Sequence, residues 1–112
     1  MSKSPIITDE AWSPDPADWL HNPHAGEILA SEFLGPAGMS PTGLAAEIHV
    51  PAARVEAMLE GSRPVDADLD IRLARYFGMS EGFFLGLQID YDLEEARRAH
   101  GPELDRIVRR AA

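Results

Sequence analysis

The segment SPTGLAAEIHVPAARVEAMLEG, residues 40–61, predicts two short helices joined by a tight turn. Ser40 can cap the first helix, and Pro41 suits the first helical position, where the amide hydrogen of another residue would be unpaired. Pro51 opens the second helix, and Gly61 ends it as a residue that tolerates a left-handed backbone. In both halves, apolar residues recur at helical spacing: Leu44, Ala45 and Ile48, then Val55, Met58 and Leu59. This is the pattern of a helix-turn-helix, whose second helix lies in the major groove of DNA.

Composition indicates one small domain. The chain has 112 residues, of which 45% are hydrophobic, and this suffices for a single core. It has no cysteine, which excludes a disulfide framework, a thiolate nucleophile and a cysteine-based zinc site, and suits a reducing cytoplasm. No apolar run approaches the roughly 20 residues that span a bilayer, and the first residues do not resemble a signal peptide.

The charge balance is unusual for a DNA-binding protein. Lysine and arginine total 10 against 19 aspartates and glutamates, a formal net charge of −9. DNA-binding domains usually carry a basic patch, because neutralising phosphates releases counterions. Any DNA affinity must therefore come from a few well-placed groups or from a dimer. An acidic protein would equally suit a basic protein partner.

Residues 1–23 read as an arm, since they contain four prolines and no sustained periodicity. Trp12 and Trp19 are its largest apolar groups. They either pack on the protein's own core or dock on a partner, because tryptophan is favoured at binding hot spots.

Further helices flank the motif. The apolar spacing predicts a core helix over residues 24–34, ended by Gly35, Pro36 and Gly38. After the motif, Asp66 is expected to cap a helix that runs to Phe77. Asp68 and Asp70 follow at its start, where acidic groups complement the helix dipole. Arg72 and Arg75 are expected to face solvent.

The next predicted helix is capped by Ser80 and is apolar on more than one side. We expect one face to pack on the core and another on a second subunit. The dimer-interface candidates are Phe83, Phe84, Leu87 and Tyr91. A charged last helix or tail follows, broken near Gly101 and Pro102.

No residue pattern predicts catalysis or metal binding. His21, His24 and Glu27 are close in sequence, but no second cluster of matching spacing accompanies them, so they are expected to be surface residues near a helix start. We find no catalytic carboxylate pair, no nucleophile with a base, and no glycine-rich phosphate loop. We therefore predict no enzyme, no metal and no cofactor.

Several stretches resemble the HigA antitoxin family, also described as virulence-associated-protein-I-like regulators, within the Cro/C1 (Xre) helix-turn-helix group. The resemblance covers roughly residues 24–95, and its most specific part is the order RLARYFGMS, FFLGLQ and YDLE from residue 72 to residue 94. The other matching stretches are HAGEIL at residues 24–29, EFL at 32–34, GLA at 43–45 and GSR at 61–63.

The resemblance implies an all-α, five-helix, lambda-repressor-like domain over residues 24–95, between an N-terminal arm of residues 1–23 and a C-terminal tail or helix of residues 96–112. It also implies a homodimer, an operator of double-stranded DNA in the gene's own promoter, and a RelE-like, mRNA-cleaving toxin as partner. Two alternatives remain: a stand-alone regulator without a toxin, and a protein-binding module of the same fold that has lost DNA binding.

This chain departs from the family at positions that would read DNA. The family commonly has a glutamine where this chain has Pro41, so a donor to phosphates and bases is lost. A glycine usually occupies the turn position of His49, for which a positive φ is costly. Glu56 stands where asparagine is common, and Ser62 replaces a lysine, while Arg63 is retained.

The candidate DNA-contacting residues are Ser40, Thr42, Ala52, Ala53, Arg54, Glu56, Ser62 and Arg63. Hydroxyl groups and amides at helix starts can donate to phosphates. An arginine can hold a phosphate or a guanine edge, and an alanine methyl can touch a thymine methyl. Glu56 could accept from a cytosine amino group, although near phosphates it is more often repulsive. For Arg54 the alternative is a salt bridge along its own helix.

Overall fold

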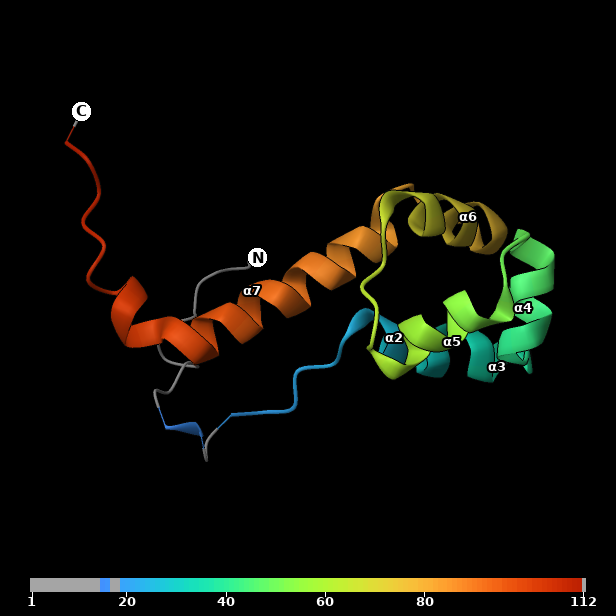
Figure 1. Cartoon of the computed structure of the whole chain (residues 1–112), viewed down its shortest axis with the longest axis horizontal. Coiled ribbons are helices and arrows are strands. Elements are labelled where there is room, and N and C mark those ends of the chain that lie inside the picture. Colours follow the sequence, from blue (N-terminus) through green and yellow to red (C-terminus); the bar gives the residue numbers. More distant parts are fainter. Residues whose placement is uncertain (1–14, 17–18, 112) are drawn as a thin grey trace. The chain divides into compact units, whose positions relative to one another are not determined.

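The computed structural model describes residues 15–16 and 19–111, so the prediction for Trp12 lies outside the described residues. Within them every regular element is helical, as predicted, and no helix is long and apolar enough to cross a membrane. The elements, shown in Figure 1, are α2 (Ala25–Ile28), the π-helix η2 (Leu29–Leu34), α3 (Gly35–Ala37), α4 (Pro41–Ile48), α5 (Ala52–Glu60), α6 (Ala67–Phe77) and α7 (Phe83–Leu104).

The chain divides into two compact units. The core unit, Pro23–Asp92, contains α2 to α6 and the first half of α7. The terminal unit combines the residues before Pro23 with those from Leu93 onward. The predicted helix-turn-helix therefore lies wholly within the core unit.

The α4–α5 pair forms as the sequence predicts. Ser40 caps α4, since its Oγ accepts a hydrogen bond from the Gly43 amide at 3.0 Å. His49 follows α4 with a φ of 63°, the left-handed conformation expected from the turn. Pro51 is the N-cap of α5 and not its first helical residue, and Gly61 ends α5 with a φ of 79°. Both helices bury the apolar face that their spacing predicts, although Leu59 is only half-buried.

The first helix is longer than predicted. Gly35 and Pro36 do not stop it; α3 continues to Ala37, and only Gly38, with a φ of 64°, ends it. The preceding turns are π-helical, and the Gly35 amide donates to the carbonyl of Ala30, five residues earlier. A π turn widens the helix, which relieves the clash between a proline ring and the carbonyl of the turn before it.

Gly26 of α2 brings the first helix against the backbone of α5. A Cβ atom at Gly26 would lie 1.9 Å from the Met58 carbonyl oxygen and 2.8 Å from the Leu59 Cα. Because both atoms are backbone, no side-chain movement would make room. Gly26 therefore sets the distance between α2 and α5.

The start of α7 is capped by a carboxylate from α6. Asp70 is 1% exposed; its Oδ1 accepts the amides of Phe84 at 2.8 Å and Leu85 at 3.0 Å, and its Oδ2 accepts the Gly82 amide at 2.6 Å. Asp66 caps α6, as predicted, by accepting from the Leu69 amide. Asp70, which was expected to serve its own helix, instead satisfies the orphan amides of the next one.

Phe84 is part of the core and not of a subunit interface, which corrects the prediction for this residue. Its side chain is fully buried, with ring centroids 5.3 Å from Phe33 and 6.5 Å from Phe77. Asp70 holds the Phe84 amide, so the residue is directed inward at the first turn of α7. The remainder of the buried apolar core is Ala25, Leu29, Leu34, Leu44, Ala45, Ile48, Val55, Met58, Val65, Leu69, Leu73 and Ala74.

In the terminal unit, α7 holds the end of the N-terminal arm. The Arg98 guanidinium lies 5.2 Å from the centroid of the Trp19 ring and donates to the Leu20 carbonyl at 2.6 Å. Asn22 donates to Glu95 at 3.1 Å. Trp19 thus packs on α7 of the protein's own chain. The backbone at His100 departs from helical geometry, close to the predicted break.

Asp70→Asn is expected to lower the free energy of unfolding by about 1–3 kcal/mol, because an amide has one acceptor oxygen and leaves a buried N–H unpaired. Urea denaturation measures the change. Asp90→Asn, which removes the same charge from an exposed site on α7, is the matched control. Equal midpoints for the two variants would contradict the capping role of Asp70.

Gly26→Ala and Gly86→Ala are expected to act in opposite directions. A Cβ at Gly26 meets the backbone of α5, so this variant should be destabilised by about 1–3 kcal/mol. Gly86 lies within α7 and a Cβ there meets nothing within 4 Å, so alanine should stabilise the helix by about 0.5–1 kcal/mol. Thermal unfolding followed by circular dichroism compares them, and a neutral Gly26→Ala would show that α2 and α5 are not in close contact.

Candidate nucleic-acid interface

One side of α5 is free to meet a partner. Val55 and Met58 are buried, whereas Ala53, Glu56 and Glu60 are exposed. The inward side is fixed by α2 and α4, which pack against this helix. The exposed side of α5 thus has the position of a recognition helix in a helix-turn-helix.

The polar candidates on either side of α5 are accessible. Ser40 is exposed, although its Oγ accepts from Gly43, and Thr42 is exposed on the first turn of α4. Ser62 is exposed and donates to the Ala57 carbonyl at 3.3 Å. Ala52 is half-buried against the core, so of the two candidate alanines Ala53 offers the more accessible methyl group.

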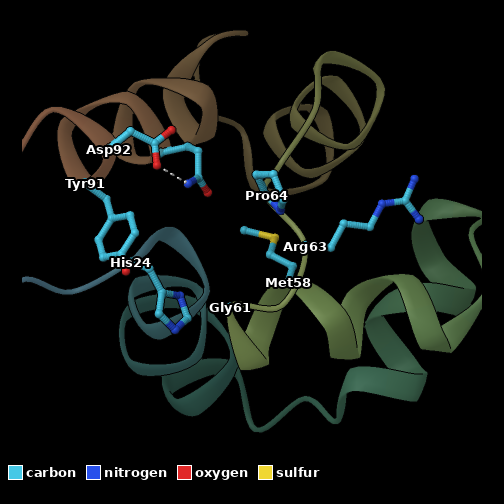
Figure 2. Close-up of a pocket in the computed structure, with 8 residues that line it drawn as sticks. His24, Met58, Gly61, Arg63, Pro64, Tyr91 and Asp92 are labelled. Atoms are coloured by element: carbon cyan, nitrogen blue, oxygen red, sulfur yellow. Dashed lines mark hydrogen bonds between the residues drawn. The ribbon is translucent and has the colours of Figure 1, made fainter. Parts of the chain in front are cut away.

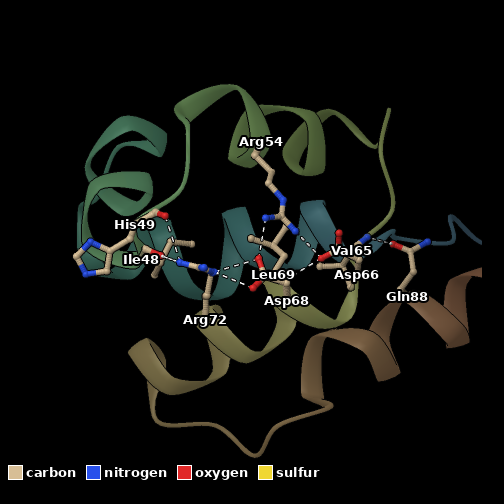
Figure 3. Close-up of polar contacts among 9 residues, drawn as sticks. All are labelled: Ile48, His49, Arg54, Val65, Asp66, Asp68, Leu69, Arg72 and Gln88. Atoms are coloured by element: carbon tan, nitrogen blue, oxygen red, sulfur yellow. Dashed lines mark hydrogen bonds and ion pairs between the residues drawn. The ribbon is translucent and has the colours of Figure 1, made fainter.

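Arg54 does not extend to solvent. Its guanidinium pairs with Asp66 at 2.5 Å and with Asp68 at 2.8 Å, and its side chain is 18% exposed (Figure 3). The salt-bridge alternative is therefore the arrangement found, with partners on α6 and not along α5. The hydrogen bond to Asp68 is the main reason that the pKa of Arg54 is raised, with burial acting in the opposite direction. The predicted DNA contact of Arg54 is not the arrangement in this structure.

Arg72 also differs from its prediction, because its guanidinium is hydrogen-bonded within the protein although the side chain is 37% exposed. Its Nη1 donates to the carbonyls of Ile48 at 2.8 Å and His49 at 3.2 Å, and its Nε donates to Asp68 at 3.0 Å (Figure 3). We call Arg54, Asp66, Asp68 and Arg72 the aspartate–arginine network. It ties α6 to the end of α4 and to the first turn of α5. Arg75, by contrast, is exposed as predicted and pairs with Glu81.

The two arginines of the aspartate–arginine network favour the charged form of Asp68. Hydrogen bonds from Arg54, and then from Arg72, hold the pKa of the Asp68 carboxyl below its ordinary value. A carboxyl whose pKa is lower in the folded state stabilises that state above its unfolded pKa, and this contribution is lost as the pH falls through the folded pKa. The contribution of Asp68 to stability is therefore present at neutral pH and is lost under acid conditions.

Arg63 is the accessible cation of this region. It is exposed in the loop after α5, and Figure 2 shows its side chain extending away from His24 and Tyr91. The loop borders an open cavity of about 210 Å³, lined by His24, Met58, Gly61, Arg63, Pro64, Gln88, Tyr91 and Asp92. His24 caps α2 and lies over Gly61, where a Cβ would be 2.8 Å from its Nε2. Thus His24 also helps to place the end of α5.

The exposed side chains of residues 40–63 carry a more negative net charge than the formal charge of this segment indicates. With Arg54 paired to α6, one exposed arginine, Arg63, stands against three exposed glutamates, Glu47, Glu56 and Glu60. The start of α5 offers a partial compensation. An α-helix leaves its first amides without intrahelical partners, and no side chain caps those of α5 after Pro51. The amides of Ala52 and Ala53 can donate to a phosphate, whereas the Arg54 amide donates to the Pro51 carbonyl.

No group of three or more potential metal ligands lies together in the described part of the chain. His21, His24 and Glu27 are not such a group. His24 instead forms a capping box with Glu27, whose carboxylate accepts from the His24 amide at 3.0 Å.

Four residues that place this surface were not assigned that role from sequence: Gly26, Asp68, Asp70 and Arg72. A sequence signal existed for one of them. Asp70 lies in the stripe formed with Ala74 and Phe77, at a spacing where an apolar residue would be expected. A carboxylate in an apolar stripe indicates a buried partner.

Comparisons with known proteins agree with this geometry. No family model matches the chain. Virulence-associated protein I of Dichelobacter nodosus is 40% identical over 75 residues, which are 67% of this chain and 69% of that protein. The structure of the Pseudomonas aeruginosa antitoxin HigA with the higBA promoter has 36% identity and a TM-score of 0.74, covering 82% of this chain and 100% of that one. An addiction module antidote protein of a HigA family from Coxiella burnetii has 37% identity and a TM-score of 0.75, with 82% and 100% covered.

The identity and coverage of these relatives confirm the family indicated by the sequence motifs. The chain belongs to the HigA family of helix-turn-helix antitoxins.

Proposed function

We propose that the protein is a sequence-specific DNA-binding repressor that acts as the antitoxin of a toxin–antitoxin pair and represses its own promoter. The observation that carries the proposal is the exposed α4–α5 pair, in a chain 36% identical to a HigA whose structure includes the higBA promoter. No catalytic function is proposed, since the relatives are antitoxins and regulators.

The proposed DNA contacts are few. Thr42, Ser62 and Arg63 would bind phosphates together with the amides at the start of α5, and the methyl group of Ala53 would touch a thymine methyl. Glu56 would either accept from a cytosine amino group or repel the backbone. Arg54 is left out of this set, because α6 holds it.

A contact set this small makes dimerisation a requirement, because two half-sites double the contacts. Of the predicted interface residues, Phe84 is buried in the core, and Phe83, Leu87 and Tyr91 are half-buried. Ile89 is 53% exposed on the same helix and is the better candidate for the dimer contact. We propose that the face of α7 that carries Ile89 contacts a second copy of the chain.

The toxin would need a separate surface. The terminal unit carries exposed apolar side chains, namely Leu20, Leu93, Leu104, Ile107 and Val108. Exposed apolar groups that gather into one patch mark protein-interaction sites, and we propose that these side chains form such a patch. Because Arg98 joins the end of the arm to α7, the arm and the tail would present this surface together.

Fluorescence anisotropy of labelled DNA from upstream of the gene, titrated with the protein at several salt concentrations, tests the proposed function. Tight, salt-sensitive binding that an unrelated duplex does not compete away is expected. Absence of binding at low salt would reject the repressor role and favour a protein-binding module, which the exposed Glu56 and Glu60 would suit. A stand-alone regulator would bind DNA but have no toxin gene beside its own.

Arg63→Ala is expected to weaken operator binding about tenfold and to lower the slope of log affinity against log salt by about 1, because one phosphate contact is lost. Arg75→Ala removes the same charge from an exposed site on α6 and should change affinity little. Equal losses for both variants would indicate a general charge effect and would contradict a contact by Arg63.

Ile89→Lys is expected to shift the protein from dimer to monomer in light scattering coupled to size exclusion, because a charge would be buried at the interface. Ala30→Lys places the same charge on an exposed site of η2 and is the control. A dimer that persists in Ile89→Lys at low concentration would show that the subunits meet elsewhere.

A further inference from the structure

The turn between α4 and α5 is held from α6. His49 adopts a positive φ of 63°, a conformation that glycine takes more easily, and the last carbonyls of α4 need donors. Arg72 supplies two, at 2.8 Å to Ile48 and 3.2 Å to His49. Through these bonds α6 stabilises the turn that sets the angle of the recognition helix.

Asp68 joins this turn to the start of α5. Its carboxylate accepts from the Nε of Arg72 at 3.0 Å and from the Nη1 of Arg54 at 2.8 Å, so one side chain holds two guanidinium groups that belong to different elements. Asp66 adds a second anchor on Arg54 while it caps α6. Figure 3 shows the four side chains converging between α5 and α6.

The network is charge-neutral and occupies the only cation of α5. Because Arg54 is paired within the protein, α5 attracts phosphates less strongly. Any contribution of the aspartate–arginine network to DNA binding must therefore be geometric. A bridge between both halves of the motif provides that geometry, because it fixes the end of α4 and the start of α5 relative to α6.

We propose that Asp68 is a positioning residue for DNA recognition: by bridging Arg72 and Arg54 it fixes the orientation of α5, and hence discrimination between the operator and other DNA, without touching DNA itself. This inference rests on the proposed function. A positioning role of Asp68 differs from an inhibitory role, in which the carboxylate would only keep Arg54 from binding phosphates.

The direction in which one substitution changes operator affinity separates these two roles. Asp68→Asn removes a negative charge near the DNA face, which by electrostatics alone would tighten binding to any DNA. A positioning role predicts the reverse for the operator, with affinity falling about tenfold, comparable to the loss of one base-pair contact, while affinity for an unrelated duplex stays level or rises. Asp68→Glu, which retains the carboxylate, should recover most of the ratio of operator to unrelated affinity.

Asp90→Asn is the control of equal charge change, on an exposed site of α7. It should leave the affinity ratio unchanged, and the thermal midpoints of all variants should stay well above the assay temperature. Tighter operator binding by Asp68→Asn would overturn the proposal in favour of inhibition, and an unchanged ratio would overturn it outright. Failure of the unsubstituted protein to bind any upstream DNA would instead reject the proposed function.

Amide hydrogen exchange without DNA provides a second readout, independent of the operator. The Val50 amide donates to the Ala45 carbonyl at 3.0 Å across the turn, and the Arg54 amide donates to the Pro51 carbonyl at 3.0 Å at the start of α5. Both amides should exchange faster in Asp68→Asn than in Asp90→Asn. Unchanged exchange at both positions would contradict the proposed fixing of the turn.

Discussion

The buried carboxylate of Asp70 is the interaction on which the arrangement of the core unit depends. Three amides at the start of α7 need acceptors, and Asp70 of α6 provides them within a site that excludes water. With α7 fixed in this way, Phe84 enters the core, and Gln88, one turn later, accepts from the Val65 amide at 3.5 Å. The loop that carries Arg63 lies directly before Val65, so its end is attached to α7. The fold therefore connects a buried cap to the position of an exposed binding loop.

An acidic chain can bind DNA with few positive groups if those groups are well placed. In this protein α6 takes two arginines, Arg54 and Arg72, for the internal bracing of the helix-turn-helix, and leaves Arg63 as the exposed cation of residues 40–63. Under the proposed function, DNA affinity would come from amides at helix starts, from hydroxyl groups and from a second copy of the chain. Specificity would depend on how firmly α5 is held. The same acidic surface would repel non-specific DNA, so low affinity for unrelated sequences accompanies the arrangement.

Local patterns predicted what depends on neighbouring residues, and they failed where a partner comes from far along the chain. The apolar spacing, the Ser40 and Asp66 caps and the left-handed His49 are all short-range features, and each was predictable from sequence. The partners of Asp70 and Arg54 were not, because they lie on another helix and charge patterning along one helix cannot reveal them. For Asp70 the apolar stripe indicates burial, but not which amides its carboxylate accepts from. The need for a glycine at position 26 was not predicted for the same reason, since the backbone of α5 leaves no room for a side chain there. The prediction that Pro36 helps to end the first helix was wrong, because a π turn allows the helix to continue through this proline.

Amide hydrogen exchange of the protein, with and without DNA from upstream of its gene, would show which surface binds DNA. We expect slower exchange in the bound protein at the start of α4, along α5 and in the loop that follows, with little direct change in the terminal unit. Slower exchange confined to the terminal unit, or none at α4 and α5 under conditions where DNA is bound, would show that this surface is not the one that reads DNA.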